Sequence, residues 1–321
     1  MKLHALRRLR IIHSRPFLRT VCVSVVIFAG CSDGPTEPRP VEWGAWSSPV
    51  LAPAVNSSDN DQQPVLSPDN LSLYFGSRRA GGLGGNDIWV SRRASINSEW
   101  QTPVNVGAPV NSAGDDQSPA FSTTGHLLFF QSARPGGFGQ QDVYVSRRSN
   151  VADDRAWGLA INLGAQVNTS VYEAGPMYLE IEGAPTSLYF ARGPTPSDVE
   201  MYSVPIDSNG LPRGSAQPLV ELNFPNPLGT DAHPTVSMDG KELIFFSDRP
   251  GGFGLADLYV STRQDVTSGW GPPQNMGPTL NTQFRDAQPS LSFDGATLVF
   301  ASDRPGGQGS TDIYFATRAR R

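Results

Sequence analysis

Acidic residues are the residues in this sequence most suited to chemistry, and they recur in five similar segments. The opening acids of the segments are Asp61, Asp116, Glu173, Asp231 and Asp286, and the closing acids are Asp87, Asp142, Glu200, Asp257 and Asp312. Two carboxylates on either side of a glycosidic bond can act as general acid and base. A catalytic residue is needed once per active site, however, so acids that return in every segment favour a structural role.

An arginine recurs together with these acids. It stands at Arg79, Arg134, Arg249 and Arg304, and Arg192 is the candidate in the third segment. Charge-assisted hydrogen bonds between arginine and carboxylate are strong and directional. We therefore expect acid–arginine or acid–backbone contacts that stabilise each unit. The third segment has lost its Pro-Gly-Gly run but keeps both acids, which indicates that the acids can serve without that loop.

A glycine-rich run, Gly-Gly-x-Gly-x-x-Asp, precedes four of the closing acids. Its copies are Gly81–Asp87, Gly136–Asp142, Gly251–Asp257 and Gly306–Asp312. A phosphate-binding loop needs a lysine and a following helix, and neither is present. A calcium-binding β-roll repeats a related run every nine residues or so, whereas this one recurs about every 55. The run is better explained as a loop in which glycines adopt positive φ angles.

Other catalytic signatures are missing. The sequence has no Gly-x-Ser-x-Gly and no His-Glu-x-x-His motif. Downstream of the first 30 residues it holds only His126 and His233, and His233 takes the position of Gln63, Ser118 and Gln288 in the other segments. We interpret it as a variant of the repeat rather than a ligand or a general base. The sequence predicts no catalytic residue, no metal site and no cofactor.

The elements that must position these residues are β-strands. The aromatic residues that close the segments, Trp89, Tyr144, Tyr202, Tyr259 and Tyr314, lie 55 to 58 residues apart. In each unit a short run such as Ser290–Ser292 precedes an Asp-Gly turn, which favours a hairpin. The following run, such as Leu298–Phe300, is apolar at successive positions, so we expect that strand to be covered on both faces.

A fourth strand is expected between units, where Trp, Pro, Gly and Asn recur, as at Trp100, Pro103, Gly107 and Asn111. The chain before the first unit holds a similar phrase from Trp46 to Asn56, and the chain after the last unit lacks one. The sequence thus predicts an all-β fold, a β-propeller of five four-stranded blades whose ring is closed by the N-terminal strand.

The repeat also resembles a known family. Pro234–Gly252 and Pro289–Gly307 carry Pro-x-x-Ser-x-Asp-Gly followed by Ser-Asp-Arg-Pro-Gly-Gly. This phrase is similar to the WD40-like repeat of TolB-type periplasmic propellers and of propellers that accompany OmpA-like envelope domains. The resemblance covers nearly all of residues 43–321 and implies an envelope propeller. TolB-like proteins usually have six blades and a preceding α/β domain, and this chain shows neither.

The first 30 residues have the pattern of an export signal. Six basic residues and no acid precede a short apolar run, Thr20–Gly30, which is too short for a permanent bilayer span. Phe28–Cys31 resembles a bacterial lipobox, which implies cleavage before Cys31 and acylation of its thiol. The alternative is ordinary cleavage nearby. Cys22 lies inside the leader, so Cys31 would be the single cysteine of the mature chain, and lipidation explains it.

The remaining chain is acidic. Without residues 1–30, 19 basic residues face 30 acidic ones, a net charge of −11. Such a body repels nucleic acid and anionic lipid, so membrane association would come from the acyl anchor. We predict a signal peptide at 1–30, the lipidated cysteine with a flexible tether at 31–42, and a propeller at 43–321. The favoured location is the outer membrane of the bacterial cell envelope, on its periplasmic face or at the cell surface.

Two functions remain open at this point. The main prediction is a non-catalytic, lipid-anchored propeller that binds an envelope protein or a glycan and is not an enzyme. Its binding candidates lie where the repetition fails, at Arg192, Asp198, Glu221 and Phe224. The alternative is a glycan-active propeller enzyme, a glycosidase or a sialidase-like protein. That alternative requires two unrepeated carboxylates near the propeller axis, about 5 to 9.5 Å apart.

Overall fold

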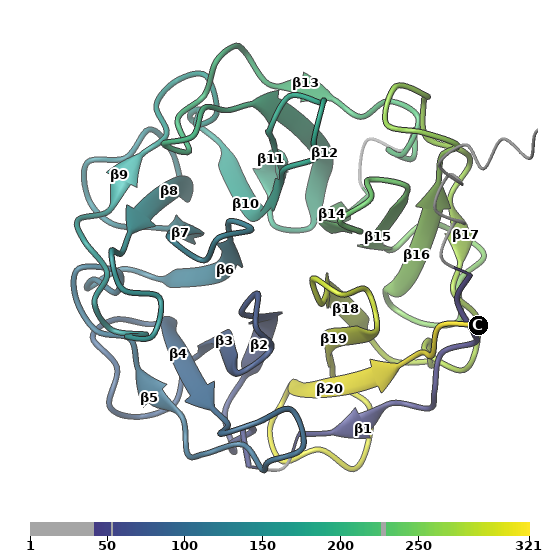
Figure 1. Cartoon of the computed structure of the whole chain (residues 1–321), viewed down its shortest axis with the longest axis horizontal. Coiled ribbons are helices and arrows are strands. Elements are labelled where there is room, and N and C mark those ends of the chain that lie inside the picture. The colour runs from purple at the N-terminus through teal and green to yellow at the C-terminus, as the bar shows by residue number, and fades with distance from the viewer. Residues whose placement is uncertain (1–41, 53, 226–228) are drawn as a thin grey trace, which may run out of the picture. The chain divides into compact units, whose positions relative to one another are not determined.

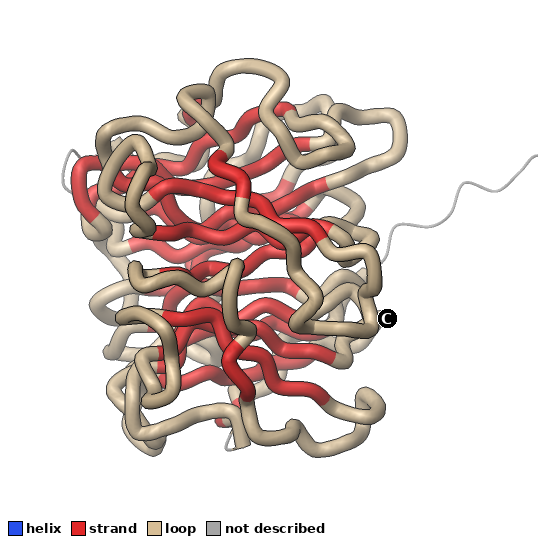
Figure 2. Tube along the Cα trace, turned by 90° about the vertical axis from the view of Figure 1, so that its left-hand side faces the viewer, coloured by secondary structure: helices blue, strands red, loops and turns tan. Residues whose placement is uncertain are grey.

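Twenty β-strands form five four-stranded antiparallel sheets in the computed structural model, which describes residues 42–52, 54–225 and 229–321. The sheets stand around a central axis as the blades of a propeller (Figure 1). A side view shows strands and loops and no helix among the described residues (Figure 2). In the described part of the chain, no helix is long and apolar enough to cross a bilayer. The predicted five-bladed β-propeller is confirmed.

Each blade consists of strands that follow one another in sequence, except that the last blade takes its outer strand from the N-terminal end. Blade 1 holds β2 (Asp61–Leu66), β3 (Ser72–Ser77), β4 (Asp87–Arg92) and β5 (Val104–Asn105). Blade 2 holds β6 (Asp116–Phe121), β7 (Leu127–Ser132), β8 (Asp142–Arg147) and β9 (Ile161–Asn162). Blade 3 holds β10 (Tyr172–Leu179), β11 (Ser187–Thr195), β12 (Asp198–Pro205) and β13 (Gln217–Pro218). Blade 4 holds β14 (Asp231–Val236), β15 (Glu242–Ser247), β16 (Asp257–Thr262) and β17 (Gln274–Asn275). Blade 5 holds β18 (Asp286–Leu291), β19 (Thr297–Ser302), β20 (Asp312–Thr317) and β1 (Val50–Leu51).

The inner strands β2, β6, β10, β14 and β18 surround the axis (Figure 1). They are longer than the short run that the sequence predicts after each proline, because each includes the opening acid and the proline itself. The pairing with the second strand shifts at that proline, as between Ala287 and Ser290. A proline cannot donate to the ladder, and a bulge at this point accommodates it.

The second strand of each blade forms the core between neighbouring blades. In β3, β7 and β15 the central apolar residues are nearly or fully buried on both faces, as Tyr74, Phe129 and Phe245 show with 0 % exposure. Continuous apolar runs are typical of strands that are covered on both sides. The prediction made from Leu298–Phe300 is therefore confirmed, since these three side chains are also fully buried in β19.

The ring closes where β1 pairs with β20, with Val50 opposite Phe315 and Leu51 opposite Tyr314. The side chain of Asn56 holds this closure: its Nδ2 donates to the carbonyl of Ile313 at 3.0 Å, and its Oδ1 accepts the Ile313 N–H at 2.8 Å. Equivalent asparagine bridges lie in the other blades, from Asn111 to Ile88, Asn168 to Val143, Asn223 to Met201 and Asn281 to Leu258.

We expect Asn56→Ala to open the closure, whereas the matched change Asn111→Ala leaves the ring shut. Each variant leaves one backbone N–H and one carbonyl without their buried partner, so each should lower the free energy of unfolding by about 2 kcal/mol. The partner of Asn56 lies 257 positions away in the sequence, whereas the partner of Asn111 lies 23 positions away. Limited proteolysis in native buffer should therefore cut residues 42–56 faster only in the Asn56 variant. Equal resistance of the two variants would show that this contact does not hold the ring.

Candidate functional site

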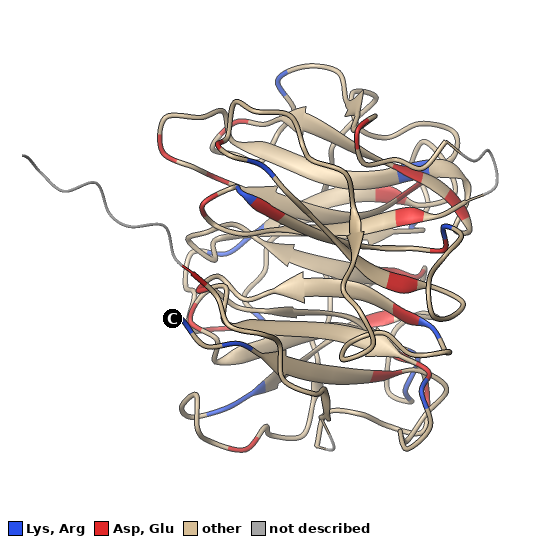
Figure 3. Ribbon diagram, turned by 90° about the vertical axis from the view of Figure 1, so that its right-hand side faces the viewer, with Lys and Arg blue, Asp and Glu red and all other residues tan. Residues whose placement is uncertain are grey.

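Each opening acid is the first or second residue of an inner strand. It forms an ion pair with the arginine of its own blade. Arg134 Nη2 lies 2.7 Å from Asp116 Oδ1, and the N–H and hydroxyl of Ser112 donate to Oδ2 at 2.5 and 2.7 Å. The equivalent pairs are Arg79–Asp61, Arg192–Glu173, Arg249–Asp231 and Arg304–Asp286, at 2.5 to 3.1 Å. Acidic residues stand at strand ends along one side of the ring (Figure 3). These carboxylates are occupied by structural partners.

Four closing acids hold the glycine-rich loops. Asp142 Oδ2 accepts the N–H of Phe138 at 2.6 Å and the amide of Asn162 at 2.7 Å. A Cβ on Gly137 would lie 2.3 Å from that oxygen, and a Cβ on Gly139 would lie 2.3 Å from the carbonyl of Val171. Only glycine fits at both positions. Asp87, Asp257 and Asp312 accept loop N–H groups in the same way, and burial raises the pKa of Asp87.

Glu200, the closing acid of the third blade, differs from this expectation. It is exposed and lies opposite Arg192 in the pairing of β11 with β12. A short hairpin joins these two strands after Thr195, so no glycine-rich loop offers its N–H groups to the carboxylate. The opening acid of this blade, Glu173, does keep its arginine.

The four residues predicted for partner binding serve the blades or face solvent. Arg192 pairs with Glu173, and Asp198 lies opposite Thr195 in the hairpin of blade 3. Phe224 donates its N–H to Asp231 at 2.6 Å, and its ring lies 5.7 Å from the guanidinium of Arg249. Glu221 is exposed. None of the four lines the pocket on the axis.

Three positions near the opening acids do vary between blades, and they lie in the strands around the axis or directly before them. The residues before the acids are Asn60, Asp115, Tyr172, Thr230 and Arg285. The residues directly after them are Gln62, Gln117, Ala174, Ala232 and Ala287. The residues two positions after them are Gln63, Ser118, Gly175, His233 and Gln288. The axis is therefore where this regular ring becomes asymmetric.

Blades 1 and 2 contribute a hydrogen-bonded arc of glutamines that reaches Tyr172 of blade 3. Gln62 Nε2 donates to Gln117 Oε1 at 3.1 Å, and Gln117 Nε2 donates to Gln141 Oε1 at 3.3 Å. Gln131 Nε2 donates to Gln141 and, at 3.0 Å, to the hydroxyl of Tyr172. Buried amides that are satisfied in this way make a rigid network.

Blades 4 and 5, like blade 3, carry alanine at the position of Gln62 and Gln117, and Arg285 precedes the inner strand of blade 5. Its guanidinium carbon is 4.9 Å from the centre of the Phe246 ring, and its backbone N–H donates to Asp303 Oδ1 at 2.7 Å. Its guanidinium forms no ion pair, at a distance of 4.0 Å or less, with a carboxylate of the described residues. Burial lowers the pKa of Arg285, and the carboxylates of Asp303 and Asp248 act in the opposite direction.

Asp115 and Tyr172 complete this group. Asp115 Oδ1 accepts the N–H of Asn86 at 2.7 Å. Burial raises the pKa of Tyr172, Asp115 adds to that effect, and the positive charge of Arg285 opposes it. We call Asp115, Tyr172, Asp248, Arg285 and Asp303 the polar end of the axis. The sequence prediction missed all five. The changing residue before each opening acid was a signal that could have found Asp115, Tyr172 and Arg285, whereas Asp248 and Asp303 lie in the repeated Ser-Asp-Arg phrase.

His233 lies beside this group in a neutral state. Its ring is 5.7 Å from that of Phe246, and a Cβ on Gly175 would lie 2.9 Å from the imidazole, so the histidine fits because blade 3 has glycine there. Burial, with a further contribution from Arg285, lowers the pKa of His233 to about 3. At neutral pH it is an uncharged contact residue.

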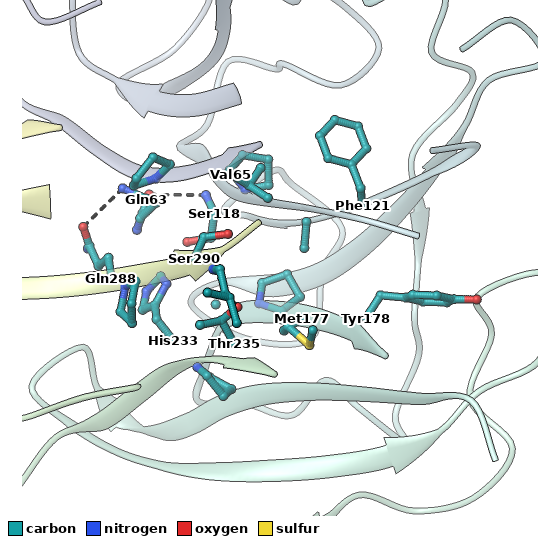
Figure 4. Close-up of a pocket in the computed structure, with 18 of the residues that line it drawn as sticks. Gln63, Val65, Ser118, Phe121, Met177, Tyr178, His233, Thr235, Gln288 and Ser290 are labelled. Carbon is teal, nitrogen blue, oxygen red and sulfur yellow. Dashed lines mark hydrogen bonds between the residues drawn. The ribbon is translucent and has the colours of Figure 1, made fainter. Parts of the chain in front are cut away.

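A pocket of about 610 Å³, including its open mouth, lies on the axis beyond the bulges (Figure 4). It begins at Gln63, Ser118, Gly175, His233 and Gln288 and continues to the ends of the inner strands. It contains none of the opening acids and none of the five residues of the polar end. Among the described residues, no group of three or more His, Cys, Asp or Glu side chains could hold a metal ion.

Solved structures with a similar fold are known, whereas no protein-family model matches the sequence and no curated protein is similar to it. An α-L-arabinofuranosidase from Lactobacillus brevis aligns with a TM-score of 0.56 and 12 % identity over 84 % of this chain and 92 % of its own. A thermostable family-43 glycoside hydrolase aligns with 0.57 and 9 % identity over the same shares. A protein of unknown function from Dyadobacter fermentans aligns with 0.53 and 12 % identity over 88 % of this chain and 99 % of its own.

At these identities the likeness establishes the fold. It also corrects the main functional prediction, because the named activities among these neighbours are those of glycoside hydrolases. The prediction of a non-catalytic propeller that binds a protein or glycan partner, and with it the prediction that the chain is not an enzyme, is contradicted by this finding. The alternative of a glycan-active propeller agrees with it better. Counting motifs misled the prediction, because Asp115 stands beside a repeated acid, and Asp248 and Asp303 belong to the repeated Ser-Asp-Arg-Pro-Gly-Gly phrase.

Because His233 stays uncharged in the folded protein, the free energy of unfolding should depend on pH. In the unfolded chain a histidine has a pKa of about 6.5, so below that pH the unfolded state binds a proton that the folded state does not. The free energy of unfolding should therefore fall as the pH drops, by about 2 kcal/mol between pH 6.5 and 5. His233→Gln, which copies the residue of blades 1 and 5, should flatten this slope in chemical denaturation. An unchanged slope would show that the histidine is not held neutral.

Proposed function

We propose that this chain is a glycan-active propeller that acts on glycosidic bonds at the polar end of its axis. The observation that carries the proposal is the position of Arg285, which stacks on Phe246 and has no ion-pair partner among the described residues. The carboxylates of Asp248 and Asp303 act on its charge. The shared fold with an α-L-arabinofuranosidase and a family-43 glycoside hydrolase supports it.

The carboxylates come from two sides of the axis. Asp115 precedes β6 of blade 2, whereas Asp248 and Asp303 follow β15 and β19 of blades 4 and 5, on the other side of the ring (Figure 1). A sugar bound between them would have one carboxylate to protonate the leaving oxygen and another to activate water or attack the anomeric carbon. The Arg285 guanidinium and the Tyr172 hydroxyl are suited to hold sugar hydroxyls.

This function predicts hydrolysis of aryl glycosides by the purified protein, with aryl α-L-arabinofuranosides and aryl β-xylosides as the first substrates. Asp115→Asn and Asp303→Asn should each lower kcat at least about 100-fold, because general acid–base catalysis typically contributes 10²- to 10⁴-fold. The exposed Glu99, in the connection between β4 and β5, provides a control. Glu99→Gln should leave kcat unchanged. Release of the chromophore is followed by absorbance.

Two results would overturn the proposal. The first is a failure to hydrolyse any glycoside in a broad panel under conditions where the protein is folded. The second is hydrolysis that persists at full rate in Asp115→Asn, Asp248→Asn and Asp303→Asn. The melting curve of each variant shows whether it is folded and so separates a loss of catalysis from a loss of structure.

We also propose that the chain is an exported lipoprotein of the bacterial cell envelope, anchored through acylated Cys31. The support is the basic leader, the short apolar run, the lipobox-like Phe28–Cys31 and the likeness of the repeat to TolB-type propellers. Residues 1–30 would be removed, residues 31–42 would be the tether, and the outer membrane is the favoured destination. These residues, apart from Glu42, lie outside the described part of the chain.

Cys31→Ala tests the anchor. Without the thiol there is no acceptor for the acyl group, and an acidic body has no attraction of its own for anionic lipid. The variant should therefore move from the membrane pellet to the soluble fraction of fractionated cells, whereas Cys22→Ala should not. A Cys31 variant that still sediments with membranes would contradict the anchor.

A further inference from the structure

The pocket on the axis has a chemistry that the proposed glycosidase reaction does not use. Its 22 lining residues include no Asp, Glu, Lys or Arg, in a chain in which 17 % of residues are charged. Its one histidine, His233, is neutral at physiological pH. A charged group buried in such a pocket would lose its hydration without gaining a partner. The pocket is therefore suited to an uncharged ligand.

The walls are mainly apolar and come from all five blades (Figure 4). Val65 and Phe121 are buried, whereas Met177, Met238 and Phe293 are partly exposed around the space. The prolines at the bulges add further apolar surface; they are Pro64, Pro119, Pro176, Pro234 and Pro289. Methionine sulfur makes favourable contacts with aromatic rings, and its flexible side chain adapts to them. This wall favours a flat apolar ring.

The floor of the pocket is polar, and it carries one unused hydroxyl. Gln288 Oε1 accepts the N–H of Gln63 at 3.3 Å, and Gln63 Oε1 accepts the N–H of Ser118 at 3.2 Å. Ser118 is 3 % exposed, and its Oγ has no hydrogen-bond partner among the described residues. An unpaired buried hydroxyl is costly, so a ligand hydroxyl that reaches it gains binding energy.

We propose that this pocket binds a small uncharged aromatic compound with one hydroxyl group, a phenol or an aromatic alcohol. The ring lies among Met177, Met238 and Phe293, and the hydroxyl meets Ser118 Oγ on the floor. The site is separate from the polar end of the axis, since the pocket extends from the bulges toward the opposite ends of the inner strands.

A free sugar fits this site poorly. Each of its several hydroxyls would need a partner, and the hydroxyls of Thr235 and Ser292 in the wall are already engaged. Thr235 Oγ1 accepts the N–H of Leu291 at 3.0 Å, and the Ser292 hydroxyl donates to Asp294 at 2.6 Å. Unmet hydroxyls in an apolar pocket disfavour binding. The geometry thus separates this ligand class from the substrate class proposed for the polar end.

The test uses p-cresol, with toluene and xylose as matched probes, in calorimetric titrations of the full chain. We expect p-cresol to bind with a Kd of about 1 mM or tighter, toluene about tenfold more weakly, and xylose not at all in this pocket. Ser118→Gly removes the hydroxyl and retains a residue that tolerates the positive φ of 54°, as Gly175 does in blade 3. It should weaken p-cresol about tenfold and leave toluene unchanged.

A second variant fills the space. Ser290 takes the wall position that Met177 holds in blade 3, so Ser290→Met introduces a side chain that the ring already accommodates there. It should abolish binding of both aromatic probes while the melting curve and the glycoside assay stay unchanged. Equal p-cresol affinity in wild type and Ser118→Gly, no aromatic binding at all, or xylose binding that Ser290→Met abolishes would each overturn the proposal. None of these outcomes depends on whether the protein hydrolyses glycosides.

Discussion

The buried ion pair between the opening acid and its arginine is the contact on which each blade depends. Arg134 pairs with Asp116 on one side and lies over the rings of Phe130 and Tyr144 on the other, 5.2 and 4.9 Å from their centres. One side chain thus joins the start of the inner strand to the aromatic residues of the second and third strands. Removing one partner of such a pair would leave an uncompensated buried charge, which explains why the same residue types return in all five blades.

Much of this fold could be predicted because it depends on local, repeated signals. The spacing of the closing aromatic residues indicates the unit, and the Trp46–Asn56 phrase indicates the closing strand. The length of the inner strands was not predicted, since a proline normally argues against a strand interior and only the bulge reconciles the two. Glu200 was misinterpreted for a related reason: the sequence retains the acid, but the loop that would need it is gone.

The site was harder to predict than the fold. Arg285, Tyr172 and Asp115 are far apart in sequence and approach one another only because five blades bring their inner strands to one axis. A repeated acid is conspicuous in the sequence, and the residue beside it is not. The repeated opening acids turned out to be paired with arginines, whereas Arg285, beside one of them, forms no ion pair within 4.0 Å among the described residues. Motif searches favour the first kind of residue, which is why they indicated a protein without a catalytic role.

The closure of the ring has a mechanical consequence. The chain N-terminal to β1 enters at the same blade edge at which β20 ends, where Trp43 pairs with Arg320. The guanidinium of Arg318 lies 4.4 Å from the rings of both Trp43 and Trp46 and reaches Glu242 in blade 4. A pulling force on the N-terminal segment would therefore load this Trp–Arg stack first and the two-residue strand β1 next. The other four blades would bear little of that tension, so the propeller would yield at one defined seam.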